Sequence, residues 1–286
     1  MRHRAGASCA AALAVLVGLS WAICATGEVA ALIAEAEALY DRWDDPFDFA
    51  AYGASLRRAI ELWERALSLL PDENVQSRSQ ILNSLSQSYF EWAEGYLPGS
   101  REKEATYELG KDAALASLRL DPVFVATEAS EGFRAALRSA SDVAAIFWYG
   151  NTLGQWLNYH QFTAVLGGVR DVSASFERSI ELDETYDGGG PHRAMAALLS
   201  QAYFVVGRSP EDAVVHFERS IEIAPSHLES AVSYAEFYAR PTGDIPLFDA
   251  LIAGVLEKAA DPTVVAAFPF YNRLSIDRAE ALVAGD

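Results

Sequence analysis

The chain has 286 residues, of which 51% are hydrophobic, enough apolar side chains to form a sizeable core. Lysine and arginine number 22 against 40 aspartates and glutamates, and the resulting net charge of −18 excludes a nucleic acid held through its phosphates. Both cysteines, Cys9 and Cys24, stand near the start of the sequence, so the remainder has no thiol for a disulfide, a thiolate metal site or a nucleophile.

The first residues have the plan of a secretory signal. Residues 1–4 are basic, residues 11–23 form an apolar run, and small residues follow it. The apolar run is shorter than a membrane span, and acidic residues come soon after it. We therefore expect residues 1–26 to be a signal peptide that exports the chain to the periplasm. Residues 27–286 are expected to fold as a single helical domain.

Cys24 raises the alternative of a lipoprotein. A lipoprotein signal places a cysteine directly after the apolar run and a small residue just before it, whereas Ile23 precedes Cys24 here. Ordinary cleavage and lipid attachment at Cys24 both stay open, with ordinary cleavage slightly favoured. In either case the body of the protein leaves the cytoplasm, and a lipid would be its contact with the membrane.

Apolar residues recur three and four positions apart along most of the chain, and prolines and glycines interrupt them, which predicts helices joined by turns. The clearest expected helices cover residues 29–40, 50–70, 81–96, 103–120, 143–161, 228–238, 246–258 and 271–283. No segment alternates as a strand would. We therefore predict an all-α fold, an α-solenoid or helical bundle of stacked helix pairs that the last helix caps.

Four predicted helix ends share one sequence template, beginning at Trp63, Ala114, Phe176 and Phe217. The two clearest copies begin 41 residues apart, whereas the tetratricopeptide period is roughly 34 residues. The template is closest to the tetratricopeptide pattern around Phe217, where small residues let paired helices approach each other. The chain is thus expected to consist of degenerate tetratricopeptide-like pairs with insertions.

A seam separates the two clearest copies. It consists of Asp187, Gly188, Gly189, Gly190, Pro191, His192 and Arg193. Consecutive glycines interrupt a helix and Pro191 suits the first turn of a new one, so we expect a repeat boundary here. His192 and Arg193 are more consistent with tying Asp187 or loop carbonyls to the helix start than with binding an anion. The seam follows a helix and has no Lys-Ser/Thr pair, which argues against a phosphate-binding loop.

Residues 143–161 combine aromatic side chains with neutral amides and carry almost no charge. The candidate ligand-contact residues are Trp148, Tyr149, Asn151, Thr152, Gln155, Trp156 and Tyr159. A fully buried face would leave amides in need of partners, and an exposed one would waste aromatic surface, so the pattern suits a groove. The alternative is ordinary core packing with the amides bonded to backbone, and Gly150 and Gly154 are consistent with such close packing.

No pattern of catalytic residues stands out. The histidines are scattered over different helices, and no Gly-x-Ser-x-Gly elbow occurs. Carboxylates are expected on solvated helix faces beside arginines, so the sequence indicates no buried acid for an all-helical hydrolase. We expect a protein that is not an enzyme and that has no catalytic residue, no metal site and no cofactor.

Three segments together resemble one known family: Phe147–Trp156, the helix end Ser179–Asp183, and Tyr186–Arg193. They are similar to the T component associated with TRAP transporters, and the likeness extends over about residues 81–282. The resemblance implies a tetratricopeptide-type periplasmic protein, usually lipid-anchored and trimeric. It also implies an accessory role, in which the protein pairs with a periplasmic solute-binding protein and passes an apolar small ligand to or from it.

The repeats by themselves leave a second function open. Concave faces of helical arrays commonly hold peptides or partner helices, so a general protein-interaction scaffold of the cell envelope would have the same pattern. Recovery of a solute-binding protein in a pull-down would favour the transport accessory, and recovery of assembly factors would favour the scaffold.

Overall fold

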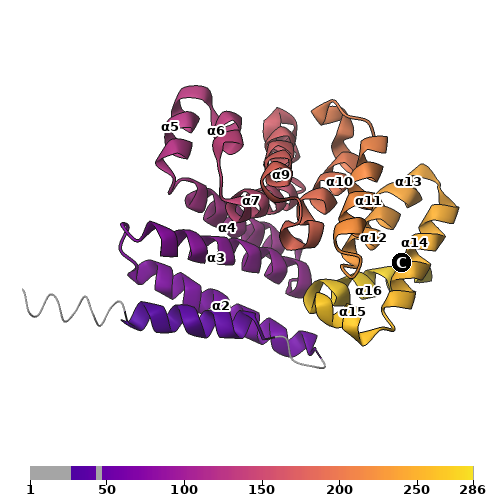
Figure 1. Cartoon of the computed structure of the whole chain (residues 1–286), viewed down its shortest axis with the longest axis horizontal. Helices are drawn as coiled ribbons and strands as arrows, with labels where there is room; N and C mark the ends of the chain where they lie inside the picture. The colour runs from indigo at the N-terminus through magenta and orange to yellow at the C-terminus, as the bar shows by residue number, and fades with distance from the viewer. Residues whose placement is uncertain (1–26, 43–46, 286) are drawn as a thin grey trace, which may run out of the picture.

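The computed structural model describes residues 27–42 and 47–285, and every regular element in those ranges is helical (Figure 1). The prediction of an all-α fold is confirmed for the described residues. The predicted signal peptide and Cys24 lie outside them. Within the described ranges, no helix combines the length and the apolar character that crossing a membrane requires.

Eighteen segments in chain order make up the described part of the fold, beginning with a helix over residues 27–40. The first half continues with α2 (Phe49–Leu69), α3 (Val75–Tyr96), α4 (Ser100–Leu118), α5 (Pro122–Glu131), α6 (Phe133–Ser139), α7 (Val143–Leu157), α8 (Gln161–Thr163) and the π-helical η1 (Ala164–Gly168). The second half contains α9 (Val169–Asp183), α10 (Tyr186–Val206), α11 (Glu211–Ile223), α12 (Glu229–Tyr234), the π-helical η2 (Ala235–Ala239), α13 (Arg240–Thr242), α14 (Ile245–Lys258), α15 (Pro262–Ala267) and α16 (Pro269–Ala284).

Aspartate side chains cap the start of α2, α5, α7, α14 and α15. Each accepts a hydrogen bond from a backbone N–H in the first turn, and the capping residues are Asp48, Asp121, Asp142, Asp244 and Asp261. Such caps satisfy N–H groups that have no partner inside the helix. The α10 helix ends at Gly207, which adopts the left-handed conformation that glycine tolerates best. Short polar and glycine-containing turns therefore set the helix boundaries.

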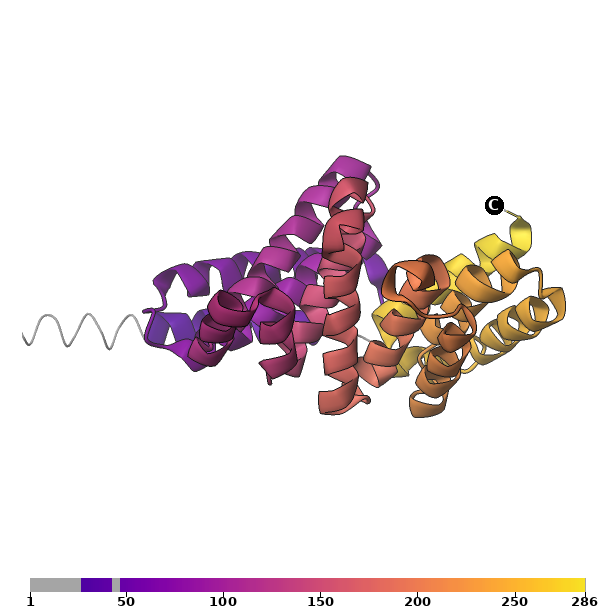
Figure 2. The same ribbon diagram turned by 90° about the horizontal axis from the view of Figure 1, so that it is seen from above.

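Successive helices pack against one another, α3 on α4, α4 on α7, α7 on α9, α9 on α10 and α10 on α11. Seen from above, the ribbon runs from the indigo N-terminal helices to the yellow C-terminal ones (Figure 2). A central core cluster contains the fully buried side chains Trp148, Phe147, Met195 and Phe217. Smaller clusters lie under the N-terminal helices and between α12, α14 and α16.

The last helix contacts both ends of the array. Ala279 of α16 packs in the C-terminal cluster, whereas Phe270 at its start is fully buried in the N-terminal cluster. The Phe270 ring stacks on Phe49 with ring centroids 5.8 Å apart, and the Tyr271 hydroxyl donates to Glu91 of α3. Figure 1 shows α16 beside the N-terminal helices accordingly. The helix predicted as a cap therefore also closes the array onto its own beginning.

One local prediction differs from the structure, and one agrees with it. The helix expected over residues 143–161 ends at Leu157, and a short helix and a π-helical segment follow. The break expected at the seam is present at the start of α10, where the backbone is not α-helical. There, Asp187, Gly188 and Gly189 have φ angles of 50°, 59° and 75°. The left-handed residues redirect the chain between α9 and the regular part of α10.

Candidate functional site

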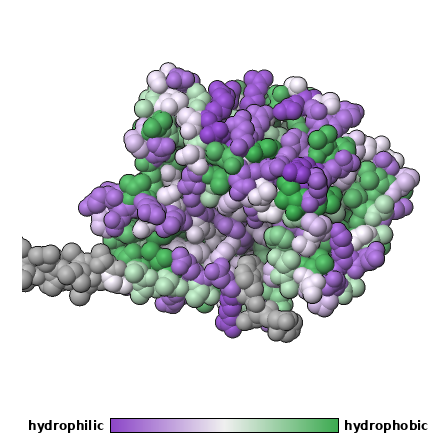
Figure 3. Space-filling model, in the orientation of Figure 1, coloured by the Kyte–Doolittle hydropathy of each residue, from purple (hydrophilic) through white to green (hydrophobic). Residues whose placement is uncertain are grey.

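A cavity of about 320 Å³ lies at the centre of the fold, and we call it the central chamber. Its walls come from α3, α4, α7, α10, α12, η2 and α16. In the space-filling view, pale and purple residues occupy the middle of the face, with green hydrophobic residues around them (Figure 3). The chamber is thus enclosed by elements from both halves of the chain.

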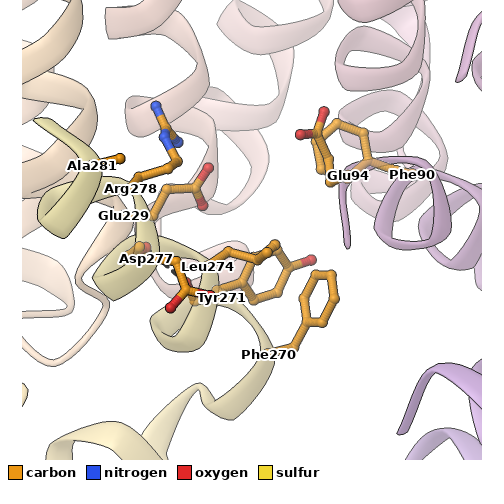
Figure 4. Close-up of a pocket in the computed structure, with 10 residues that line it drawn as sticks. Phe90, Glu94, Glu229, Phe270, Tyr271, Leu274, Asp277, Arg278 and Ala281 are labelled. Carbon is orange, nitrogen blue, oxygen red and sulfur yellow. Dashed lines mark hydrogen bonds between the residues drawn. The ribbon is translucent and has the colours of Figure 1, made fainter. Parts of the chain in front are cut away.

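Three further cavities share lining residues with the chamber and therefore adjoin it. A cleft of about 320 Å³ between α3 and α16 shares Phe90, Glu94 and Tyr271, among others (Figure 4). An outer groove of about 200 Å³ on the far side of α7 and α10 shares Asn151 and Gln155. A third, of about 330 Å³, shares Tyr271 and Asp187 and is called the Glu91 cavity below.

The α7 side of the chamber presents four of the seven candidate ligand-contact residues, Trp148, Asn151, Gln155 and Tyr159. Trp148 is 2% exposed, and its Nε1 donates to the Tyr186 hydroxyl at 3.0 Å. The Asn151 amide donates to the carbonyl of residue 147 at 3.0 Å, while Tyr159 is 37% exposed. The α7 wall therefore places aromatic edges and amide groups on one surface.

The other three candidates lie elsewhere and line none of these four cavities. Tyr149 packs in the core against Phe133, with ring centroids 5.3 Å apart. Thr152 is fully buried and donates to the carbonyl of residue 148. Trp156 stacks on His160 at 3.6 Å between ring centroids. They contact neighbouring elements because adjacent positions on a helix point about 100° apart.

Charged side chains of both signs line the chamber. Glu229 and Arg278 project from the wall that α12 and α16 form, and Glu94 lies on the opposite α3 wall (Figure 4). Burial raises the pKa of Glu94, which accepts a hydrogen bond from Tyr107 at 2.6 Å. Lys103 lines the same space, and its positive charge opposes the rise in the pKa of Glu94. A ligand here would meet aromatic rings and charges together.

Arg193 of the seam is another cation that lines the chamber. It is buried, with its Nη2 2.8 Å from Asp187 Oδ2 and its Nε 3.1 Å from Glu229 Oε2. Burial raises the pKa of Asp187 to about 6 in spite of the attraction of Arg193. One guanidinium therefore ties the left-handed turn to α12 and is shared between two carboxylates.

The seam glycines allow helices to approach closely. A Cβ on Gly190 would lie 2.7 Å from Cζ of Phe147, and one on Gly189 would lie 3.2 Å from the backbone of Ser220. Gly188 and Pro191 belong to the same turn, and Gly190 also lines the chamber. The turn therefore brings α10 against α7 and α11.

His192 belongs to a polar network behind the seam. Its Nδ1 lies 2.8 Å from Nδ1 of His216, and its Nε2 lies 3.1 Å from the Glu184 carboxylate. Burial lowers the pKa of both histidines, to about 4 for His216. His192 does not line the chamber, so its contacts are those of a residue that holds α10 and α11 together.

The model of the TRAP transporter T-component family matches residues 104–286, which is more than half of the chain. The chain belongs to the TRAP transporter T-component family. It is accordingly an accessory component of a TRAP-type transport system. No curated protein sequence matches it. The family match begins within α4. The α3 wall of the chamber in this T component therefore lies before the matched region.

The α3 helix also contains Glu91, which borders the Glu91 cavity and which the sequence reasoning missed. Glu91 is fully buried, and its Oε1 accepts hydrogen bonds from Tyr40 at 2.8 Å, Tyr271 at 2.9 Å and Gln87 at 3.0 Å. Burial raises its pKa to about 7. The expectation that the T component keeps its carboxylates on solvated faces is therefore wrong for Glu91 and for Asp187.

A local signal for Glu91 does exist in the sequence. It stands between Phe90 and Trp92, so this charge lies within an aromatic stretch of a predicted helix. Its hydrogen-bond donors come from the helix over residues 27–40 and from α16, which no local pattern reveals. Elsewhere in the described part of the T component, no cluster of three or more metal-binding side chains occurs.

Proposed function

We propose that this T component pairs with a periplasmic solute-binding protein and exchanges with it a small ligand that has an apolar body. The observation that carries the proposal is the central chamber, whose α7 wall combines Trp148 and Tyr159 with the amides of Asn151 and Gln155. Its volume of about 320 Å³ is at the lower end of the usual range for small-molecule sites.

The chamber walls suit a ligand with both apolar and polar parts. Phe90, Phe147 and Phe237 offer ring surface, and such contact supplies much of the binding free energy for small molecules. Lys103 offers a cation with three N–H donors, so a polar end of the ligand would be oriented there. The ligand is thus expected to be amphipathic, with its larger part apolar.

The proposal includes an exported protein. Residues 1–26 would act as the signal peptide, and a lipid on Cys24, if attached, would hold the T component at the membrane. Pairing and ligand transfer need no chemical step, so we propose that the protein is not an enzyme. We also expect a homo-trimer, which size-exclusion chromatography with light scattering measures.

A blocking variant tests the chamber. Ala197 of α10 lines both the chamber and the outer groove, so Ala197→Trp should fill the space between them. Ala54→Trp on the exposed face of α2 is the matched control. Native mass spectrometry of gently purified protein should find a bound small molecule in the wild type and in the control, and not in Ala197→Trp. A wild type without bound or titratable ligand would contradict the proposal.

Partner identity separates this function from the general scaffold. The scaffold is favoured by Phe162, Val165 and Leu166, three exposed apolar residues within one short segment that could contact another protein. Co-purification of the tagged T component with a solute-binding protein would support the transport role. Recovery of envelope assembly factors in its place would support the scaffold.

A further inference from the structure

Four large apolar side chains are exposed on two neighbouring segments, and we call them the apolar tip. Phe162, Val165 and Leu166 belong to α8 and η1, and Phe204 belongs to the last turn of α10. These residues are 71–79% exposed. Arg170, just after η1, donates from its Nε to the carbonyl of residue 205 at 3.3 Å, so the two segments lie side by side.

The backbone of η1 keeps the apolar face away from the core. Phe162, Val165 and Leu166 have three- and four-residue spacing, which places them on one helix face, and such a face usually packs inward. Here Gly168 makes the inward contact, because a Cβ on it would lie 2.7 Å from Cδ2 of Leu157. An apolar face that the fold leaves in solvent indicates a contact outside the chain.

The charge around the tip differs from that of the whole chain. The net charge is −18, yet residues 156–170 and 194–210 contain no aspartate or glutamate and include Arg170 and Arg208. Carboxylates next to these stretches are paired with basic side chains. The pairs are Asp171 with Arg134 at 2.6 Å, Glu177 with Arg208 at 3.6 Å and Glu104 with His160 at 3.0 Å. Exposed charges more than about 10 Å apart are largely screened at physiological salt, so the distant carboxylates do not keep the tip from an anionic surface.

We propose that the apolar tip binds the surface of an anionic lipid bilayer. The four apolar side chains enter the boundary between headgroups and acyl chains, and Arg170 lies among the headgroup phosphates. A stable protein interface takes about 20–30 residues on each partner, whereas this kind of insertion needs only a few apolar side chains with cations beside them. The proposal rests on the proposed export of the chain, and it goes beyond ligand exchange because it needs neither the chamber nor a solute-binding protein.

A fluorophore on the tip tests for contact with lipid. The protein carries Cys24→Ser, so that no lipid can be attached there, and is secreted by an expression host. It is labelled with nitrobenzoxadiazole on Leu166→Cys or, as the control, on Val283→Cys, which is 63% exposed in α16. Vesicles of equal parts phosphatidylglycerol and phosphatidylcholine should raise the emission at least about twofold for Leu166→Cys and leave it unchanged for Val283→Cys.

Two outcomes of the fluorescence experiment would overturn the proposal. One is an equal rise at both positions, which would mean that the whole surface adsorbs to vesicles. The other is no response of labelled Leu166→Cys to vesicles. If its emission then changes with a partner protein or with protein concentration, the tip is a protein interface.

Vesicle sedimentation of the same Cys24→Ser protein measures what the tip contributes to binding. Phe162→Ser with Leu166→Ser should weaken binding at least about tenfold, and the matched pair Ile245→Ser with Val283→Ser, also exposed, should leave it unchanged. Circular dichroism checks that each variant is folded. Unchanged binding by the folded tip variant, or an equal loss in the control pair, would contradict the proposal.

Two further comparisons separate the charge and the chamber from the apolar side chains. Arg170→Gln should weaken binding to the anionic vesicles about fivefold, whereas Arg57→Gln on exposed α2 should not; equal effects would refute the role of Arg170. Phe162 and Leu166 do not line the chamber, so the tip variant should keep any small molecule that native mass spectrometry finds in the wild type. Failure of the chamber proposal and failure of this one therefore give different results.

Discussion

Replacing Glu91 with glutamine should flatten the pH dependence of the protein's stability. Burial raises the pKa of Glu91 from 4.5 to about 7, so the folded state holds this proton more tightly than the unfolded state does. The stability that Glu91 contributes is therefore fully present below about pH 4.5 and is lost as the pH rises through about 7. Glutamine keeps an oxygen for the three donors around it but does not ionise.

The size of the effect follows from the shift. For a group whose pKa changes from 4.5 to about 7, proton linkage gives a loss of about 2.5 kcal/mol in the free energy of unfolding between about pH 5 and about pH 8. The raised pKa of Asp187 adds a further decrease in the free energy of unfolding as the pH rises. The lowered pKa values of His192 and His216 have the opposite effect, since their contribution is lost as the pH falls. These groups are common to both proteins, so the difference between wild type and Glu91→Gln isolates Glu91.

The measurement is urea unfolding followed by circular dichroism at several pH values from about 5 to about 8, for the wild type, Glu91→Gln and Glu64→Gln. The free energy of Glu91→Gln relative to wild type should rise by about 2.5 kcal/mol across this range, and Glu64→Gln should run parallel to wild type. Parallel curves for wild type and Glu91→Gln would refute the reasoning, because they would mean that Glu91 has the same proton affinity in both states.

Three further substitutions test the seam and the closure of the array. Arg193→Ala should lower the free energy of unfolding by about 3–5 kcal/mol, because the buried guanidinium is lost and two partly buried carboxylates lose their cation. Arg208→Ala breaks only an exposed pair and should lower it by less than about 1 kcal/mol. Equal melting temperatures for Arg193→Ala and Arg208→Ala would contradict this. Phe270→Ala should lower the free energy of unfolding, measured in urea, by about 3–5 kcal/mol, because the ring is fully buried against Phe49. A decrease below about 1 kcal/mol would show that α16 does not hold the array closed. Gly190→Ala should lower the melting temperature, because the added Cβ has no room beside Phe147. Gly254→Ala is the control and should raise the melting temperature slightly, because Gly254 faces open space. Melting-temperature shifts of the same sign in the two variants would disprove the packing argument.

Local sequence signals were sufficient to predict the positions of most helices. Proline and glycine turns placed the ends of α3 and α14 at Tyr96 and Lys258, as expected, because these residues act on the backbone nearby. The break between α5 and α6 was not predicted, although it falls at Gly132 with a φ of 91°. The left-handed Asp187 was also not predicted, since only tertiary contacts hold a non-glycine residue in that conformation.

The candidate site was predictable only in part. Helical periodicity grouped Trp148, Asn151, Gln155 and Tyr159, which do line one cavity, because residues three and four apart share a face. It could not indicate that Glu91 would meet α16, since side-chain periodicity describes a single helix and not the helices that pack on it. Charged residues that are far apart in the sequence meet in the chamber through the return of the last helix.

The contacts of α16 also determine when the cavities are completed during synthesis. Tyr271 and Glu91 are 180 residues apart along the chain, so α3 is made long before the helix that completes its hydrogen bonds. Contacts at such separation form late, while the earlier part of a chain begins to fold first. A nascent chain that stops before α16 would have neither Phe270 in its N-terminal core nor the α16 walls of the cavities. The walls of these cavities are therefore complete only in the finished polypeptide.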